Sequence, residues 1–244
     1  MQRSEIRDRA RKKLGETTAA FWTNEELNGY INDGCRDLSF RTKSIKANTY
    51  LTTADCAQNE SGAAATEVTL TSIDPALYSV EQVYFLVDGT QWVRLKPYER
   101  DAMDIDYPGW RDAIGRTYVD GPTTYYNYGS MPGTPILYYW DREEDLFGWW
   151  LPTDSTQSNS NNMRIYFTKR HTDLTGDTQE PQLPEPLTNA IIDYVIATGL
   201  EDRGWGDKAN DRWNKYFKKI EDYRIETSRE RTDEDTESRN YRNI

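Results

Sequence analysis

The residue types that most often carry catalysis are scarce in this sequence. His171 is the single histidine, and neither Cys35 nor Cys56 stands at a spacing from it that is typical of a nucleophile–base pair or a zinc site. The glycine-rich phosphate-binding patterns and the Gly-x-Ser-x-Gly turn of hydrolases do not occur either. We therefore expect no catalytic residue, no cofactor and no metal site. His171 is interpreted as a loop or strand-end residue.

Carboxylates offer the remaining route to chemistry. Asp104 with Asp106, or the run Glu143, Glu144 and Asp145, could supply an acid–base pair or bind a divalent ion. Tryptophans in the same region could form a platform for a sugar: Trp140, Trp149 and Trp150. The acidic run fits a charged turn between two strands better. Carboxylate catalysis and carbohydrate binding remain alternatives to a structural role.

Composition narrows the possible partners. The 244 residues include 41 acidic and 30 basic side chains, a net charge of −11, which argues against general affinity for nucleic acid phosphates but not against lining a channel for DNA. No apolar run approaches the roughly 18 residues of a membrane span, and residues 1–15 are too charged for a signal peptide. Two cysteines favour a reducing compartment without a disulfide framework. Eight Trp and seventeen Tyr could anchor interfaces or fill the core.

The N-terminal region predicts two helices. The first covers residues 3–14, ends at Gly15, and stacks Arg3, Arg7 and Arg11 on one face. We interpret this face as solvated; contact with DNA or an acidic neighbour is the alternative. The second helix begins at a capping box of Thr23 and Glu26 and continues to about Arg41. On it, Gly34 would allow another helix to approach closely, and Cys35 is interpreted as a packing residue.

Two further helices are predicted near the C-terminus, joined by a turn at Gly204 and Gly206. The first, residues 187–200, is apolar on almost all sides, so either its own subunit or a subunit interface must bury it. The second has an apolar stripe and an opposite charged face, which predicts a helix at the surface of the bundle. The stripe consists of Ala209, Trp213, Tyr216, Phe217, Ile220 and Tyr223.

Between these helical regions the pattern is that of strands. A hairpin is predicted over residues 80–95 about Asp88-Gly89, followed by a short helix within 97–104. Other strands are expected at 66–70, 134–140, 146–151 and 163–169, with a tyrosine-bearing loop at 121–134 and an exposed hairpin tip at 153–162.

The predicted fold class is therefore α+β, with a helical bundle scaffold built from N- and C-terminal helices, a β-rich insertion and an extended C-terminal tail. The expected domains are the scaffold (1–47 and 182–226), the insertion (48–181) and the tail (227–244). The tail is so polar that we expect it to be disordered alone and to order on a partner, or else on its own subunit.

In this order, the segments resemble the head-to-tail adaptor (connector) proteins of tailed bacteriophages. The resemblance is carried by Trp22–Leu38, Thr134–Trp140, Met163–Arg170 and Leu183–Tyr223. It implies a homo-oligomeric ring, usually of twelve subunits, that lies beneath the portal protein, joins it to a tail or nozzle protein and lets DNA pass without sequence-specific binding. It also implies a virion protein assembled in the host cytoplasm, without a membrane. The alternative is a tail- or fibre-associated binding module that uses the aromatic β region.

With this resemblance in view, residues can be assigned to three expected contacts. The expected portal contacts are Arg229, Arg231, Tyr241 and Ile244. The expected subunit interface consists of Ile192, Val195, Ile196 and Trp205, and the expected tail-side contact of Tyr125, Tyr126 and Tyr128.

Overall fold

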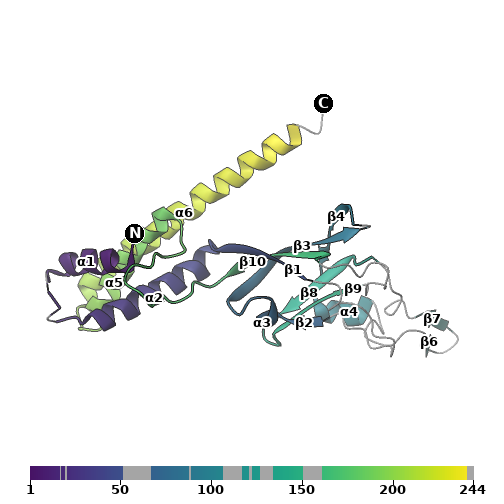
Figure 1. The fold of residues 1–244 in the computed structure, drawn as a ribbon, viewed down its shortest axis with the longest axis horizontal. Coiled ribbons are helices and arrows are strands. Elements are labelled where there is room, and N and C mark those ends of the chain that lie inside the picture. Colours follow the sequence, from purple (N-terminus) through teal and green to yellow (C-terminus); the bar gives the residue numbers. More distant parts are fainter. Residues whose placement is uncertain are drawn as a thin grey trace. The chain divides into compact units, whose positions relative to one another are not determined.

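The chain folds into two units, which Figure 1 shows in a computed structural model. Met1–Ile45 and Arg170–Ile244 form a helical unit, and Lys46–Lys169 form a β-rich unit. The structure describes residues 1–16, 18–19, 21–51, 67–87, 89–106, 117–120, 123–126, 134–150 and 161–240. For residues 104, 117–120, 123–126 and 229–240 it describes the backbone alone. The presence of both helices and sheets confirms the α+β class.

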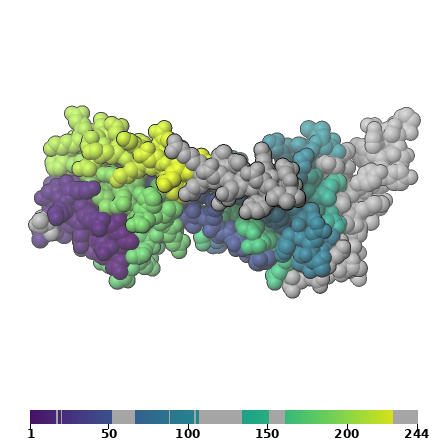
Figure 2. Space-filling view, turned by 90° about the horizontal axis from the view of Figure 1, so that it is seen from above, coloured from purple at the N-terminus to yellow at the C-terminus, as the bar shows by residue number. Residues whose placement is uncertain are grey.

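The helical unit is built around its most apolar helix. Its elements are α1 (Arg3–Leu14), α2 (Asn24–Thr42), α5 (Glu185–Glu201) and α6 (Gly206–Asn240). Each of α1, α2 and α6 packs against α5, so α5 contributes more buried side chains than any other helix of the unit. Figure 2 shows α1 (purple) and α6 (yellow-green) on the surface of this unit.

Local signals explain the ends of these helices. Thr23 accepts a hydrogen bond from the Glu26 amide (3.1 Å), and Glu26 accepts one from the Thr23 amide (2.7 Å), as the capping box predicts. Gly15 and Gly204 adopt the left-handed conformation (φ 82° and 75°): Gly15 ends α1, and Gly204 is the last residue of the turn after α5. A Cβ atom on Gly34 would lie 2.9 Å from the Tyr194 ring, so this glycine does allow α5 to approach α2 closely.

The border between the units differs from the expected one. Residues 170–181 were expected in the insertion, but they belong to the helical unit. They are held there by hydrogen bonds to α1 and α2: Arg3 Nη1 donates to the Leu174 carbonyl (2.5 Å), the Leu174 amide to Asn32 (2.9 Å) and the His171 amide to Ser39 (3.1 Å). Polar side chains of α1 and α2 thus bind the backbone of this linker, a contact that hydrophobic patterning does not detect.

The C-terminal segment also differs from the expectation. The prediction of an extended tail over residues 227–244 is wrong for the part that the structure describes, because α6 continues as one helix to Asn240. No glycine or proline follows Gly206, and opposite charges recur four residues apart, as in Arg229 with Asp233 and Arg231 with Asp235. At 1.5 Å per residue, 35 helical residues extend roughly 52 Å. Figure 1 shows α6 extending beyond the other helices of its unit.

The β-rich unit contains two four-stranded sheets. The first has the order β1 (Lys46–Leu51), β10 (Met163–Lys169), β3 (Leu77–Val87) and β4 (Gln91–Arg94), with antiparallel neighbours throughout. The second has the order β2 (Glu67–Thr69), β9 (Leu146–Trp150), β8 (Leu137–Asp141) and β5 (Lys96–Pro97), in which β5 is parallel to β8. Shorter elements are α3 (Leu70–Ile73), α4 (Arg100–Asp106) and the hairpin of β6 (Thr117–Asp120) and β7 (Thr123–Tyr126).

One hydrophobic core joins the two sheets. Phe85 and Ile165 of the first sheet cluster with Phe147 and Trp149 of the second, and all four are fully buried. The hairpin about Asp88-Gly89 is confirmed as β3 and β4, with Gly89 at a positive φ of 69°. The expected hairpin tip at 153–162 lies outside the described residues apart from Asn161 and Asn162.

Candidate interaction surfaces

The residues expected at a subunit interface separate into two groups. Ile192, Val195 and Ile196 are at most 3% exposed, because they lie in the core that α5 forms with the other helices of its own unit. Assigning these three to an interface is therefore wrong: the subunit itself encloses the apolar helix. Trp205 is 44% exposed and remains a predicted contact.

Trp205 belongs to an exposed aromatic surface, here called the Trp205 patch, formed by Phe21, Arg203, Trp205 and Lys208. Its rings stack, since Phe21 and Trp205 are 6.1 Å apart at an interplanar angle of 2°. Arg203 lies over Phe21 (4.5 Å) and Lys208 over Trp205 (5.4 Å). The turn holds Trp205 in place, because its amide donates to the Leu200 carbonyl (2.9 Å). The sequence analysis identified Trp205 but missed Phe21, which lies 184 residues away along the chain.

A second aromatic surface of the helical unit is a groove between α2 and α6, here called the Phe217 groove. Its volume is about 710 Å³, and it is lined by Asp37, Arg41, Tyr194, Asn210, Trp213, Asn214, Tyr216 and Phe217. Phe217 is 46% exposed and carries the Arg41 guanidinium 5.3 Å above its ring. Tyr216 is buried, and burial together with its hydrogen bond to Asp37 raises the pKa of its hydroxyl.

The predicted portal and tail-side residues are placed only in part. Arg229 and Arg231 lie on the distal part of α6, where the structure describes the backbone, and Tyr241 and Ile244 lie outside the described residues. Tyr125 and Tyr126 lie on β7, again with the backbone alone described, and Tyr128 lies outside. These assignments remain predictions.

The arginine face of α1 is not solvated. Arg3, Arg7 and Arg11 are at most 9% exposed. Arg3 and Arg7 both bind Asp177 (2.8 and 3.0 Å), and Arg7 and Arg3 lower the pKa of this carboxyl to about 2 through those hydrogen bonds. Arg11 pairs with Glu16 (2.8 Å). The acidic neighbour named as an alternative therefore exists, and it belongs to the same chain.

The carboxylates considered for chemistry serve turns and ion pairs. Asp141 accepts hydrogen bonds from the Glu143 and Glu144 amides (2.8 and 3.3 Å), Glu144 pairs with Arg100, and Asp145 accepts one from the Thr71 amide (3.0 Å). The run is thus a charged turn between β8 and β9, as predicted. Asp106 accepts a hydrogen bond from the Tyr98 hydroxyl, and the side chain of Asp104 is not described.

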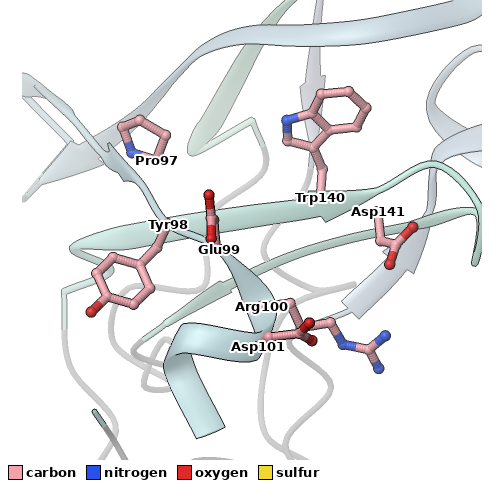
Figure 3. Close-up of a pocket in the computed structure, with 7 residues that line it drawn as sticks. All are labelled: Pro97, Tyr98, Glu99, Arg100, Asp101, Trp140 and Asp141. Carbon is pink, nitrogen blue, oxygen red and sulfur yellow. The ribbon is translucent and has the colours of Figure 1, made fainter. Parts of the chain in front are cut away.

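Beside this turn is an open pocket of about 580 Å³, drawn in Figure 3. It is lined by Pro97, Tyr98, Glu99, Arg100, Asp101, Trp140 and Asp141. The tryptophan platform considered as an alternative does not form here, because Trp149 and Trp150 are 0% and 5% exposed and fill the core. Trp140 alone of the three reaches the pocket.

His171 and Cys35 are buried packing residues of the helical unit. His171 Nε2 accepts a hydrogen bond from the Gln182 amide (2.9 Å), and burial lowers the pKa of the imidazole. Burial raises the pKa of the Cys35 thiol to about 12, which removes its reactivity at neutral pH. Cys56 lies outside the described residues. Within the described residues, no three His, Cys, Asp or Glu side chains gather as metal ligands would.

Comparison with protein families identifies a match over nearly the whole chain. The family model described as SU10 adaptor protein matches residues 1–242, a range that includes both units. No curated protein matches the chain. In the described part of the chain, no helix has the length and hydropathy required to cross a bilayer.

Proposed function

The chain belongs to the SU10 adaptor protein family, a family of bacteriophage head-to-tail adaptors, and from this premise we propose that it forms a ring beneath the portal and joins capsid to tail. Membership makes it a structural component of the phage particle rather than an enzyme. The ring of twelve copies, the portal above it and the tail or nozzle protein below it are parts of the proposal.

A closed ring requires two different surfaces on each subunit, one for each neighbour. The helical unit offers such a pair in the Trp205 patch and the Phe217 groove. Each combines an exposed aromatic ring with an arginine guanidinium, and arginine and tryptophan are among the residues that carry much of the energy of protein contacts. We assign these two surfaces to contacts between subunits.

The distal part of α6 is assigned to the portal, and its helical extension is the observation that carries this assignment. The last described hydrogen bond from α6 to another helix is that of Arg224 to the Arg41 carbonyl (2.7 Å). Sixteen further residues, 225–240, continue as helix. A charged helix of this length gains stability when a partner covers it. Arg229, Arg231, Tyr241 and Ile244 are the proposed contacts.

The β-rich unit is assigned to the tail side, with Tyr125, Tyr126 and Tyr128 as proposed contacts. DNA passes through the ring without sequence-specific binding. Twelve copies with a net charge of −11 would carry about −130 charges, and a lumen of this sign would repel the duplex and let it slide.

Truncation tests the portal assignment. Deleting residues 228–244 should abolish attachment to the portal, measured by co-sedimentation with purified portal rings, and leave the circular dichroism melting temperature of the helical unit nearly unchanged. Deleting only residues 241–244 distinguishes the contribution of Tyr241 and Ile244 from that of Arg229 and Arg231. Normal attachment by the longer truncation would contradict the assignment.

The mass of the portal-bound complex tests the ring. Twelve copies of the chain per portal are expected. Three copies would favour the alternative, a fibre-associated binding module, since fibre proteins are generally trimers. The burial of Trp149 and Trp150 already removes two of the three tryptophans considered for binding a glycan.

A further inference from the structure

One face of the first sheet in the β-rich unit packs the core, and its opposite face exposes aromatic side chains. Because cross-strand partners point to the same face, Tyr50 of β1, Arg164 of β10 and Tyr84 of β3 form one row. Tyr166 lies two residues along β10 and Trp92 on β4, both on that same face. These five residues are here called the Arg164 face.

The aromatic rings of this face surround Arg164. Its guanidinium carbon lies 4.6 Å from the centre of the Tyr166 ring and 5.3 Å from that of Tyr50. Tyr50 and Trp92 come from the two edge strands of the sheet, yet their rings are 6.1 Å apart. The two are also the most exposed members, at 43% and 40%. The rings therefore fix the orientation of the guanidinium while leaving part of the face open.

Arg164 has no anionic partner among the residues that the structure describes. No described carboxylate lies within 4.0 Å of its guanidinium, in contrast to Arg3, Arg7, Arg11 and Arg36. Its one described hydrogen bond is a long one of 3.5 Å to the Asn48 side chain, and its Nε is buried without an acceptor. A guanidinium that is oriented in advance and lacks a carboxylate is suited to bind one from outside.

We propose that the Arg164 face binds an acidic segment of another virion protein. A partner carboxylate would bind the guanidinium of Arg164, and apolar side chains beside it would cover Tyr50 and Trp92. The composition of Tyr, Trp and Arg is that of the residues which dominate protein–protein binding energy. A nucleic acid fits less well, because this face adds only one further arginine, Arg94, the cross-strand partner of Tyr84, and the chain as a whole carries a charge of −11. The inference rests on the proposed function, in which the β-rich unit faces the tail.

Photo-crosslinking in assembled phage particles identifies the partner. With p-benzoylphenylalanine in place of Trp92, irradiation should join the chain to a tail protein, at a peptide that contains Asp or Glu and is identified by mass spectrometry. The matched control places the same group at Gln91, whose side chain points to the opposite face of β4, and should not give this product. Crosslinks only to DNA or to a second copy of the chain, or no product at all, would overturn the proposal.

Substitution at Arg164 measures its contribution. Arg164→Gln should reduce the retention of tails on portal-bound particles at least tenfold, and Arg164→Lys should also reduce it because an ammonium cannot stack as a planar group does. Gln91→Ala should leave it unchanged, and equal melting temperatures of the variants establish that they fold. Unchanged retention in both Arg164 variants would refute the role of this residue. If tail retention is unchanged while the variants remain on the portal, only this inference fails; if the wild-type chain is absent from particles, the proposed function fails with it.

Discussion

Asp177 shows how a single side chain of the linker 170–181 holds it against helix α1. Arg3 and Arg7 come from successive turns of α1 and reach the same carboxylate, with each arginine largely buried. The pattern of arginines four residues apart was visible in the sequence, but the acceptor of Arg3 and Arg7 lies 174 and 170 residues away. Local reasoning could therefore identify the stripe and not its partner. By contrast, the roles of Thr23 and Gly204 depend on neighbouring residues or on backbone conformation, and they were predictable. Gly34 was predicted to allow the close approach of a helix, but its partner Tyr194, 160 residues away, was not identified.

His171 gives this linker a dependence on pH. Its pKa in the folded chain lies below the ordinary value of 6.5, so the unfolded chain binds a proton first as the pH falls. The free energy of unfolding should thus be constant above about pH 6.5 and decrease below it, by up to about 1.4 kcal/mol per pH unit. Urea unfolding between pH 7.5 and 5 measures this slope.

The variant His171→Gln is the matched control for this prediction. A glutamine oxygen can accept the Gln182 amide as Nε2 does, but it does not titrate. Because His171 is the only histidine, the variant should show little slope in this range. If the free energy of unfolding depended equally on pH in the wild type and the variant, the dependence would arise from carboxylates and not from His171.

At the scale of elements, α5 and α6 are joined by a buried carboxylate as well as by apolar contacts. Asp193 of α5 is 3% exposed and binds Arg212 (3.3 Å) and Lys219 (2.5 Å) of α6. The two cations lie on the charged face of α6 that sequence periodicity predicts at the surface. The helix pair was predicted from the sequence, whereas this contact was not, since its residues are 19 and 26 positions apart.

Replacing Asp193 should therefore loosen the helix pair. Asp193→Ala leaves two cations without their carboxylate, and we expect a loss of about 2–3 kcal/mol in the free energy of unfolding, below the largest values for buried pairs because both partners are partly exposed. Chemical denaturation measures it. The exposed pair Asp211 and Lys215 supplies the control: Asp211→Ala should change stability far less. Equal losses would refute the importance of burial at Asp193.

Some features of the two sheets and of helix α6 could be predicted from the sequence, and others could not. The hairpin about Gly89 and the strand at 163–169 were predicted because alternation and turn residues are local signals. The pairing of β1 with β10 joins Lys46 to Thr168 across more than 120 residues, and no periodicity encodes such a partner. The length of α6 was not predicted. Residues 227–244 were interpreted as an extended tail because they are polar, although they contain no glycine or proline that would end a helix.

For the whole molecule, the negative net charge of each copy opposes the proposed assembly into a ring. Every copy carries a net charge of −11, while the Trp205 patch and the Phe217 groove offer aromatic contacts. Raising NaCl from about 0.05 M to about 0.5 M screens the repulsion between copies and should increase the fraction of rings, measured by analytical ultracentrifugation.

The variant Trp205→Ser tests which surface is responsible. It should form fewer rings at every salt concentration, while Ile105→Ser, which replaces a 79% exposed residue of the β-rich unit, should not. A ring fraction that falls with salt would show that ion pairs, not aromatic contacts, join the subunits.

The candidate surfaces, like the elements of the fold, were predictable only where the signal is local in the sequence. Composition and the order of segments indicated a structural protein with aromatic contacts, and Trp205 was found because it stands between two glycines. Phe21 and the Arg164 face were not predicted, because their contacts join residues that are distant in the sequence. Ile192, Val195 and Ile196 were assigned wrongly because apolar character does not reveal whether the same subunit or a neighbouring one buries a residue.

The paired positions of Lys46 and Thr168 have a consequence for phage evolution. The β-rich unit begins and ends on adjacent strands, so its two chain ends lie next to each other. Recombination at these two borders would exchange residues 46–169 as a cassette and leave the helices intact. If the β-rich unit faces the tail, as proposed, this exchange would let a phage lineage acquire a different tail while it keeps its own capsid.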